Sequence, residues 1–143
     1  MTKVDFYTGV DDKLRTACHL SHKAMQNGQR VLLRASDETT ADALDKLLWQ
    51  YPVTAFMPHG RNDSATSIEM PVVIDHRGET FPHNEVLISL HTECLPFFSR
   101  FERVLEIVSQ DAEDVRLGRE RFSFYRDRGY EIRHIDLSKQ LEY

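Results

Sequence analysis

The chain has 143 residues, of which 41% are hydrophobic and 29% are charged, and its formal net charge is −5. These values predict one folded domain over residues 1–143 and exclude a disordered chain. No apolar run reaches the roughly 18–20 residues of a membrane-spanning helix, and the N-terminal MTKVDFYTGVDD lacks the apolar core of a signal peptide. Two cysteines, Cys18 and Cys94, cannot build a disulfide framework, so we predict a reduced, cytoplasmic protein.

Apolar runs alternate with helical periods along the chain. The predicted strands are Lys3 to Thr8, Arg30 to Ala35, Pro71 to Asp75, Glu85 to Leu90 and, as an edge strand, Glu131 to Ile135. Predicted helices begin after Asp11 or Asp12, after Ser36 or Asp37, and at Asp111, and they end at Gly28, Pro52 and Gly129. Leu95 to Phe101 is expected to form a short helix, Arg103 to Val108 a strand or a helix end, and Pro58 to Thr66 a loop.

This alternation predicts a three-layer α/β sandwich with a mostly parallel sheet between helices. The arrangement is Rossmann-like, but the six glycines are isolated, at positions 9, 28, 60, 78, 118 and 129. A phosphate cradle needs clustered glycines, and neither G-x-G-x-x-G nor G-x-x-x-x-G-K-[ST] occurs. The sequence therefore predicts no dinucleotide cofactor and no phosphate-binding loop.

Catalytic and metal-binding candidates are few. His19 and His22 share a helix face, but no cysteine or carboxylate cluster completes a metal site, so a polar helix edge is the favoured interpretation. Cys18 lies on an apolar stripe, which favours a buried structural thiol over a nucleophile. The carboxylates of the second helix have the spacing of a solvated outer face; they are Asp37, Glu38, Asp42 and Asp45.

Arginine is concentrated near the C-terminus. Six arginines and three acidic residues lie between Arg116 and Arg133, so this segment carries +3 and the rest of the chain −8. Val115, Gly118, Phe122 and Tyr125 recur at helical spacing and predict an apolar stripe, which Arg119 and Arg126 border. An apolar pocket with an arginine rim suits a short acidic peptide with a free carboxylate. A salt-bridged surface helix is the alternative.

Nucleic acid competes as the partner of these arginines. Bases could stack on Phe122, Phe124 or Tyr125, which leaves weak contact with single-stranded DNA open. The acidic pI of about 5.8 and the absence of a nucleic-acid-binding motif oppose that interpretation.

Large aromatic residues and prolines gather between Leu48 and His59, in the run LWQYPVTAFMPH. Prolines keep such a segment extended, and aromatic residues and methionine are enriched in interface cores. The run therefore fits an interaction surface, although Trp49 and Phe56 fit equally well as a cover over the domain's own core.

Together these motifs resemble the chi subunits of bacterial DNA polymerase III. The matching segments, in order, are Phe6-Tyr7, R-V-L-L at Arg30 to Leu33, L-W-x-x-P-x-x-x-F-x-P-H at Leu48 to His59, E-V-L-I-S-L at Glu85 to Leu90, F-x-x-F-x-x-V at Phe98 to Val104, and R-E-R-F-x-x-Y-R-x-x-G-Y at Arg119 to Tyr130. The Leu48–His59 run and the last helix are the specific matches.

The resemblance implies a non-catalytic subunit that binds two proteins. One is psi, which tethers it to the clamp loader; the other is the C-terminal tail of single-stranded DNA-binding protein, an acidic segment that ends in proline, phenylalanine and a free carboxylate. The implied tail-binding residues are Arg119 and Phe122, to which we add Arg116, Val108 and Ile132; the implied psi-binding residues are Trp49, Phe56, Pro58 and His59. A lysine of the family pattern is replaced by Ser123, and Arg116 is a candidate to compensate.

Two other functions compete with the adaptor hypothesis. One is a small α/β hydrolase or nucleotide-binding enzyme that uses the acidic surface and the histidines. The other is direct binding of single-stranded DNA. We expect no metal, no cofactor and no membrane contact.

Overall fold

The computed structural model describes residues 2–50, 58–62, 70–78 and 81–139. Its strands are β1 (Lys3–Val10), β2 (Val31–Arg34), β3 (His59–Arg61), β4 (Val72–Asp75), β5 (Val86–Ser89), β6 (Arg103–Ser109) and β7 (Glu131–Asp136). The helices are α1 (Lys13–Gln26), α2 (Glu38–Gln50) and α3 (Ala112–Asp127), with single 3₁₀ turns η2 (Phe98–Arg100) and η3 (Leu137–Lys139).

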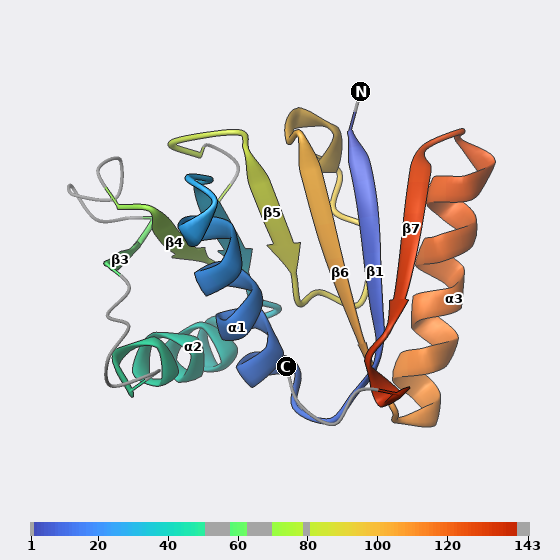
Figure 1. Cartoon of the computed structure of the whole chain (residues 1–143), viewed down its shortest axis with the longest axis horizontal. Helices are drawn as coiled ribbons and strands as arrows, with labels where there is room; N and C mark the ends of the chain where they lie inside the picture. Colours follow the sequence, from blue (N-terminus) through green and yellow to red (C-terminus); the bar gives the residue numbers. More distant parts are fainter. Residues whose placement is uncertain (1, 51–57, 63–69, 79–80, 140–143) are drawn as a thin grey trace.

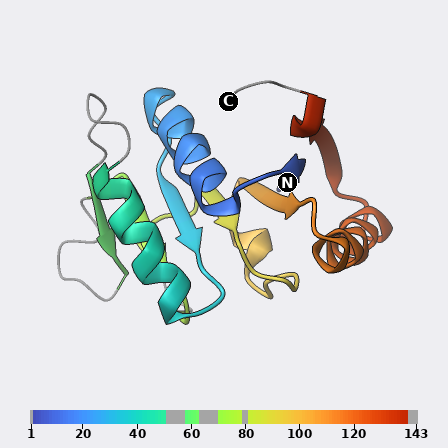
Figure 2. The same ribbon diagram turned by 90° about the horizontal axis from the view of Figure 1, so that it is seen from below.

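The described strands form one seven-stranded sheet in the order β3-β4-β2-β5-β6-β1-β7, and every pairing in it is parallel. Helices lie on both faces, as a parallel sheet requires. Side chains of α1 and α2 pack on one face around Leu33 and Ile74, and those of α3 pack on the other around Phe6 and Val104. Figure 2 shows α1 and α3 on opposite sides of the sheet. The predicted three-layer α/β sandwich is confirmed.

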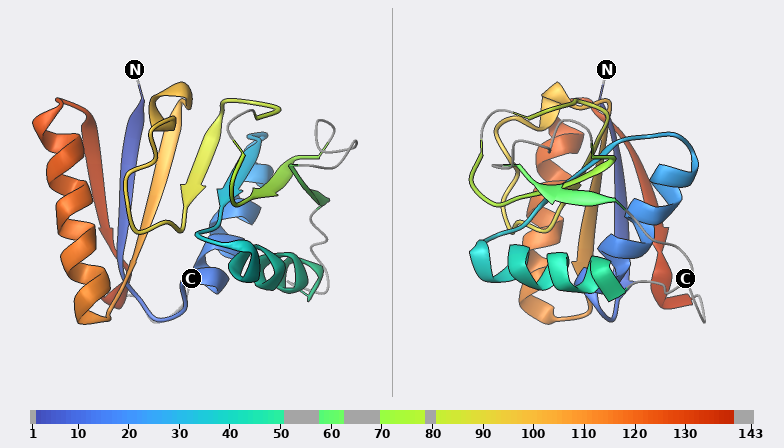
Figure 3. Two further views of the ribbon diagram at one scale, coloured as in Figure 1. Left: turned by 180° about the vertical axis from the view of Figure 1, so that it is seen from behind. Right: turned by 90° about the vertical axis from the view of Figure 1, so that its left-hand side faces the viewer.

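The two edges of the sheet are far apart. Figures 1 and 3 show β3 beside α2 at one end and β7 beside α3 at the other. β7 pairs with β1 along its whole length, from Lys3 opposite Glu131 to Thr8 opposite Asp136. The predicted edge strand is thus confirmed, and it brings the C-terminal part of the chain alongside the N-terminal strand.

Local capping explains where the helices begin and end. Asp12 accepts a hydrogen bond from the Arg15 backbone N–H at 3.1 Å and starts α1, and Asp111 does the same for α3 with Asp114. Gly28 and Gly129 follow α1 and α3 with φ of 76° and 79°, the left-handed conformation that glycine adopts without strain.

Three predictions needed revision or a decision. The expected Pro58–Thr66 loop contains β3, because His59–Arg61 pairs with Val72–Ile74 of β4, a contact between distant segments. The expected short helix is reduced to the 3₁₀ turn Phe98–Arg100, and Arg103–Ser109 is a strand.

No helix in the described part of the chain is long and apolar enough to cross a membrane.

The acidic face predicted for α2 is not wholly solvated. Asp45 contacts the His59 ring at 2.9 Å, and Asp42 accepts from Arg61 at 2.9 Å. Both partners belong to β3. These carboxylates therefore attach the short edge strand to α2, a role that helix spacing alone did not reveal.

Candidate functional site

A buried ion pair fixes α3 against the sheet. Arg121 Nε donates to Glu106 Oε1 of β6 at 3.0 Å, and Arg121 Nη1 donates to the Thr92 carbonyl at 2.9 Å. The Tyr125 hydroxyl donates to the other Glu106 oxygen at 2.7 Å. All of these side chains but Thr92 are almost fully buried. Arg121 is thus a structural residue, although the sequence groups it with the surface arginines.

Burial controls the ionisation of this network. It raises the pKa of Glu106, and the Arg121 guanidinium opposes that shift. The pKa of Tyr125 is also raised, by burial first and then by the Glu106 carboxylate. One sequence signal could have predicted the network, since Glu106 stands inside the apolar strand RVLEIVS and a buried carboxylate needs a partner.

Beside this network, between α3 and the ends of β6, β1 and β7, lies a cavity of about 540 Å³. Its apolar part comes from both sheet and helix. The lining residues are Phe6, Thr8, Gly9, Val108, Ser109, Gln110, Val115, Gly118, Arg119, Phe122, His134, Asp136 and Ser138. Three of the five predicted tail-binding residues, Arg119, Phe122 and Val108, therefore border one cavity.

The predicted apolar stripe on α3 is divided between two environments. Tyr125 is buried beneath the helix and does not line the cavity, whereas Gly118, which is buried, and Val115 and Phe122, which are half-buried, all line it. Phe122 packs edge-to-face on Phe6 of β1, with ring centroids 5.3 Å apart. A ring fixed in this way provides a rigid apolar wall.

Arg119 differs from the other arginines of its segment. Arg116 is held by Glu113 and Glu120, Arg126 pairs with Asp127, and Arg133 pairs with Asp5. Arg128 lies 3.6 Å above the Phe124 ring. Among the described residues, Arg119 forms no ion pair, hydrogen bond or ring contact, and it is exposed at the cavity rim. Its guanidinium is available for an anionic ligand.

The two remaining tail-binding candidates do not line the cavity. Arg116 is exposed, and its guanidinium is engaged by two glutamates of α3, so a new anion has to compete with both. Ile132 is half-buried and packs against the part of the core that lies between the sheet and α3. The proposed compensation for Ser123 by Arg116 lacks support in this geometry.

The far wall of the cavity is polar, and it was not predicted. His134 Nε2 lies 2.7 Å from the Thr8 hydroxyl, and the Asp136 carboxylate accepts from the Ser138 hydroxyl at 2.6 Å. Gln110 Nε2 donates to the Gly9 carbonyl at 3.0 Å. Thr8, His134 and Asp136 come together through the pairing of β1 with β7, which no local sequence pattern indicates, and Gln110 follows the end of β6.

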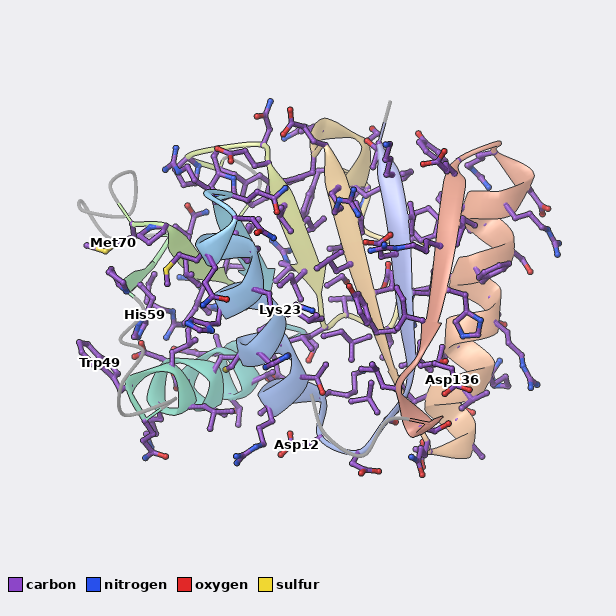
Figure 4. The ribbon with its side chains drawn as sticks, in the orientation of Figure 1. Asp12, Lys23, Trp49, His59, Met70 and Asp136 are labelled. Carbon is purple, nitrogen blue, oxygen red and sulfur yellow. The ribbon has the colours of Figure 1, made fainter. Side chains whose placement is uncertain are left out.

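A second surface lies at the other end of the sheet, where the aromatic run begins. Trp49, at the end of α2, is 64% exposed, and its ring centroid lies 4.9 Å from that of His59 in an edge contact (Figure 4). Pro58 is exposed, while the His59 side chain is 1% exposed. Phe56 lies outside the described residues. Trp49 therefore does not cover the core, whereas His59 is available only as a buried support for Trp49.

Burial keeps both cysteine thiols protonated. Cys18 is fully buried, and burial raises its pKa to about 12, as expected for a structural thiol. Burial also raises the pKa of Cys94, to about 11. The described residues contain no group of three or more side chains placed to hold a metal ion.

Comparison with known proteins identifies the family. The model of the family described as "DNA polymerase III chi subunit, HolC" matches residues 1–133. The chain belongs to this family.

Relatives of the same description support this assignment. The DNA polymerase III subunit chi of Pseudomonas aeruginosa is 34% identical, over 92% of this chain and 94% of its own. That of Escherichia coli is 30% identical, over 92% of this chain and 88% of its own. The resemblance drawn from the sequence motifs is confirmed. Within this chi family member, the matched region ends inside β7, and it includes every residue that lines the cavity except His134, Asp136 and Ser138.

Proposed function

We propose that this chi family member is a non-catalytic accessory subunit of the DNA polymerase III holoenzyme in the cytoplasm. In this role it links the clamp loader, through psi, to the C-terminal tail of single-stranded DNA-binding protein. Family membership supports a place in DNA polymerase III. The observation that carries the tail-binding part is the cavity of about 540 Å³ with Arg119 exposed at its rim.

The chemistry of this cavity suits the end of such a tail. A terminal phenylalanine ring fits between Val108, Val115 and Phe122, where burial of apolar surface provides most of the affinity. The free carboxylate then pairs with Arg119, whose planar fork binds a carboxylate through two hydrogen bonds. Acidic residues further along the tail stay in solvent near the arginine-rich segment.

The surface we assign to psi is built around Trp49. A tryptophan that is 64% exposed is the kind of side chain that anchors protein interfaces. Pro58 lies exposed nearby, and His59, packed under Trp49 and held by Asp45, keeps the indole in place. Phe56 belongs to the same assignment through the family motif. Because α2 and α3 lie at opposite ends of the sheet (Figure 1), both partners can bind one chi subunit together.

Substitution of Arg119 tests the tail site directly. We expect Arg119→Ala to weaken binding of a fluorescent tail peptide about ten- to a hundredfold in an anisotropy titration, since a hydrogen bond to a charged group contributes about 1.5–3 kcal/mol. Arg119→Lys should restore part of the loss, because a lysine cannot form the two-pronged contact.

Arg126→Ala is the matched control. It removes an exposed arginine from the same helix, but Arg126 pairs with Asp127 and does not line the cavity. Binding of the tail should therefore stay within about twofold of wild type. Equal affinities of the Arg119→Ala and wild-type proteins would refute the assignment.

A further inference from the structure

α1 is a basic helix in an acidic chain. Its sequence, KLRTACHLSHKAMQ, has three basic residues and two histidines and no acidic residue, whereas the whole chain carries −5. Lys13, at the start of the helix, is neutralised by Asp114 at 3.3 Å. Lys23, in its last turn, is exposed and forms no ion pair with any described residue. The positive charge of α1 is thus uncompensated at its C-terminal end.

The sheet continues this positive region. Asp5 is 3% exposed and accepts from two guanidiniums, Arg103 at 2.7 Å and Arg133 at 3.1 Å, so these three groups carry a net positive charge. Figure 1 shows the β1 and β7 end of this face without a covering helix in the described part of the chain. Arg133 and Ile135 point to this face, since the alternate residue His134 lines the cavity under α3.

A groove of about 230 Å³ lies between α1 and β7, and we call it the α1–β7 groove. Its lining combines three aliphatic residues and a tyrosine with a threonine, a histidine and two basic residues. It is lined by Tyr7, Thr16, His19, Leu20, Lys23, Arg133, Ile135 and Leu137. Thr16 is fully buried, and its hydroxyl has no hydrogen-bond partner among the described residues. Figure 4 shows Lys23 on the flank of α1 that is turned toward β6 and β1.

We propose that the α1–β7 groove binds a segment of a partner protein that contains acidic residues next to aliphatic residues such as leucine. A carboxylate of that segment lies between Lys23 and Arg133, and an aliphatic side chain next to it packs on Leu20 and Ile135. This site is separate from the tail cavity, because the two lie on opposite faces of β7. It extends the proposed adaptor function with a third contact.

The lining favours protein over nucleic acid. Three aliphatic side chains, Leu20, Ile135 and Leu137, form one wall, and Tyr7 is the one phenol ring in the lining, whereas a strand of nucleobases needs successive aromatic side chains for stacking. A chain of net charge −5 also repels a polyphosphate backbone outside a small basic patch. A single carboxylate needs only the two cations that the groove provides.

The pKa of His19 depends on the electrostatic potential in this groove. Its pKa is lowered, first by burial and then by the positive charge of Lys23 and by His22. Arg133 lines the same groove from β7, and Tyr7, which interacts with Asp5 and Arg133, lines it from β1. A bound carboxylate stabilises the imidazolium ion, so it should raise the pKa of His19.

The probe is an N-acetylated, C-amidated octapeptide of alternating glutamate and leucine, added to the full chain and followed by NMR. We expect saturable shifts of the residues around Lys23 and Arg133 and a higher pKa for His19. Lys23→Glu should weaken binding roughly tenfold, because it replaces an attractive charge with a repulsive one. Lys23→Gln removes the positive charge without adding a negative one, so it should weaken binding less than Lys23→Glu does.

Lys46→Glu is the matched control, since it makes the same charge change on the exposed surface of α2 and should bind the octapeptide like wild type. The octapeptide has no free C-terminal carboxylate, and binding of the tail peptide should be unchanged in Lys23→Glu, so this test and that of the tail site fail independently. Equal affinities of Lys23→Glu and Lys46→Glu, or shifts confined to α3, would overturn the proposal. So would shifts in the groove caused by a twelve-residue oligothymidylate but not by the octapeptide.

Discussion

Gly118 determines how closely α3 approaches β6. A Cβ atom at this position would lie 2.8 Å from Val108 Cγ2, well inside van der Waals contact. Val108 is buried and β-branched, so it has little freedom to move away. The close approach also places Val108 in the wall of the cavity. Arg119, which follows Gly118 in the sequence, lies at the rim.

This contact predicts that the effect of Gly118→Ala on the free energy of unfolding has opposite signs in two backgrounds, the wild type and Val108→Ala. Gly118→Ala should lower the free energy of unfolding by roughly 1 kcal/mol, because overpacking costs about 1–3 kcal/mol and the gain in helix propensity returns about 1 kcal/mol. In a Val108→Ala background, where the clash is absent, the same substitution should be stabilising. Urea denaturation of the four proteins measures both effects, and a stabilising Gly118→Ala in the wild-type background would contradict the packing argument.

At the scale of elements, the strands and helices that local signals specify were predictable. Aspartate caps, glycine ends and apolar runs located all three helices and five of the strands, and they left Arg103 to Val108 undecided between a strand and a helix end. β3 was missed because HGR has no strand pattern and exists only through its pairing with β4. Long-range pairing overrode local preference there.

The site was predictable to the same extent. Arg119 and Phe122 were chosen because the family motif and the helix period mark them, whereas no sequence signal of this kind marks Val108, which lies on β6. Thr8, His134 and Asp136 were not, since they meet only when β7 adds to β1, more than 120 residues away. Arg121 was misjudged as one of several surface arginines because sequence does not show that Glu106 lies beneath it.

The ion pair between Arg121 and Glu106 attaches α3 to the sheet, and its loss should be costly. Glu106→Gln leaves the Arg121 charge buried without a counterion, which we expect to cost about 3–5 kcal/mol and to lower the melting temperature by roughly 10 °C. Differential scanning calorimetry measures this change.

The double variant Glu106→Gln/Arg121→Met provides the control. It removes the buried Arg121 charge that has no counterion in the single variant. The amide oxygen at position 106 can still accept a hydrogen bond from the Tyr125 hydroxyl. Most of the lost stability should therefore return. If the double variant were as unstable as the single one, the buried charge would not be the cause.

At the scale of the whole molecule, the sheet separates the two surfaces that we propose for binding. β3 and α2, the helix that carries Trp49, lie at one end of the sheet, and α3 lies at the other (Figure 3). The charge is divided as well, with +3 between Arg116 and Arg133 and −8 elsewhere. On the proposed function, this charge distribution attracts an acidic tail to one end and leaves the end around Trp49 for a partner that binds through apolar contacts.

This separation predicts that the two interactions are independent. Trp49→Ala should weaken psi binding at least tenfold, as expected for an exposed aromatic anchor, with little loss of stability because the side chain is 64% exposed. Tail affinity should not change in this variant. Arg119→Ala should show the reverse pattern, and the two effects should add in the double variant, since sites with no shared contacts do not couple.

Surface plasmon resonance with psi immobilised measures both interactions in one experiment. Chi is bound to psi first and the tail peptide is added second; the peptide should bind to the complex with the affinity it has for free chi. Higher salt should weaken the tail contact, because it screens the Arg119 ion pair, and should leave the Trp49 contact nearly unchanged. A tail affinity that differs more than about threefold between free and psi-bound chi would show that the ends communicate through the sheet, against the rigid arrangement of its seven parallel strands.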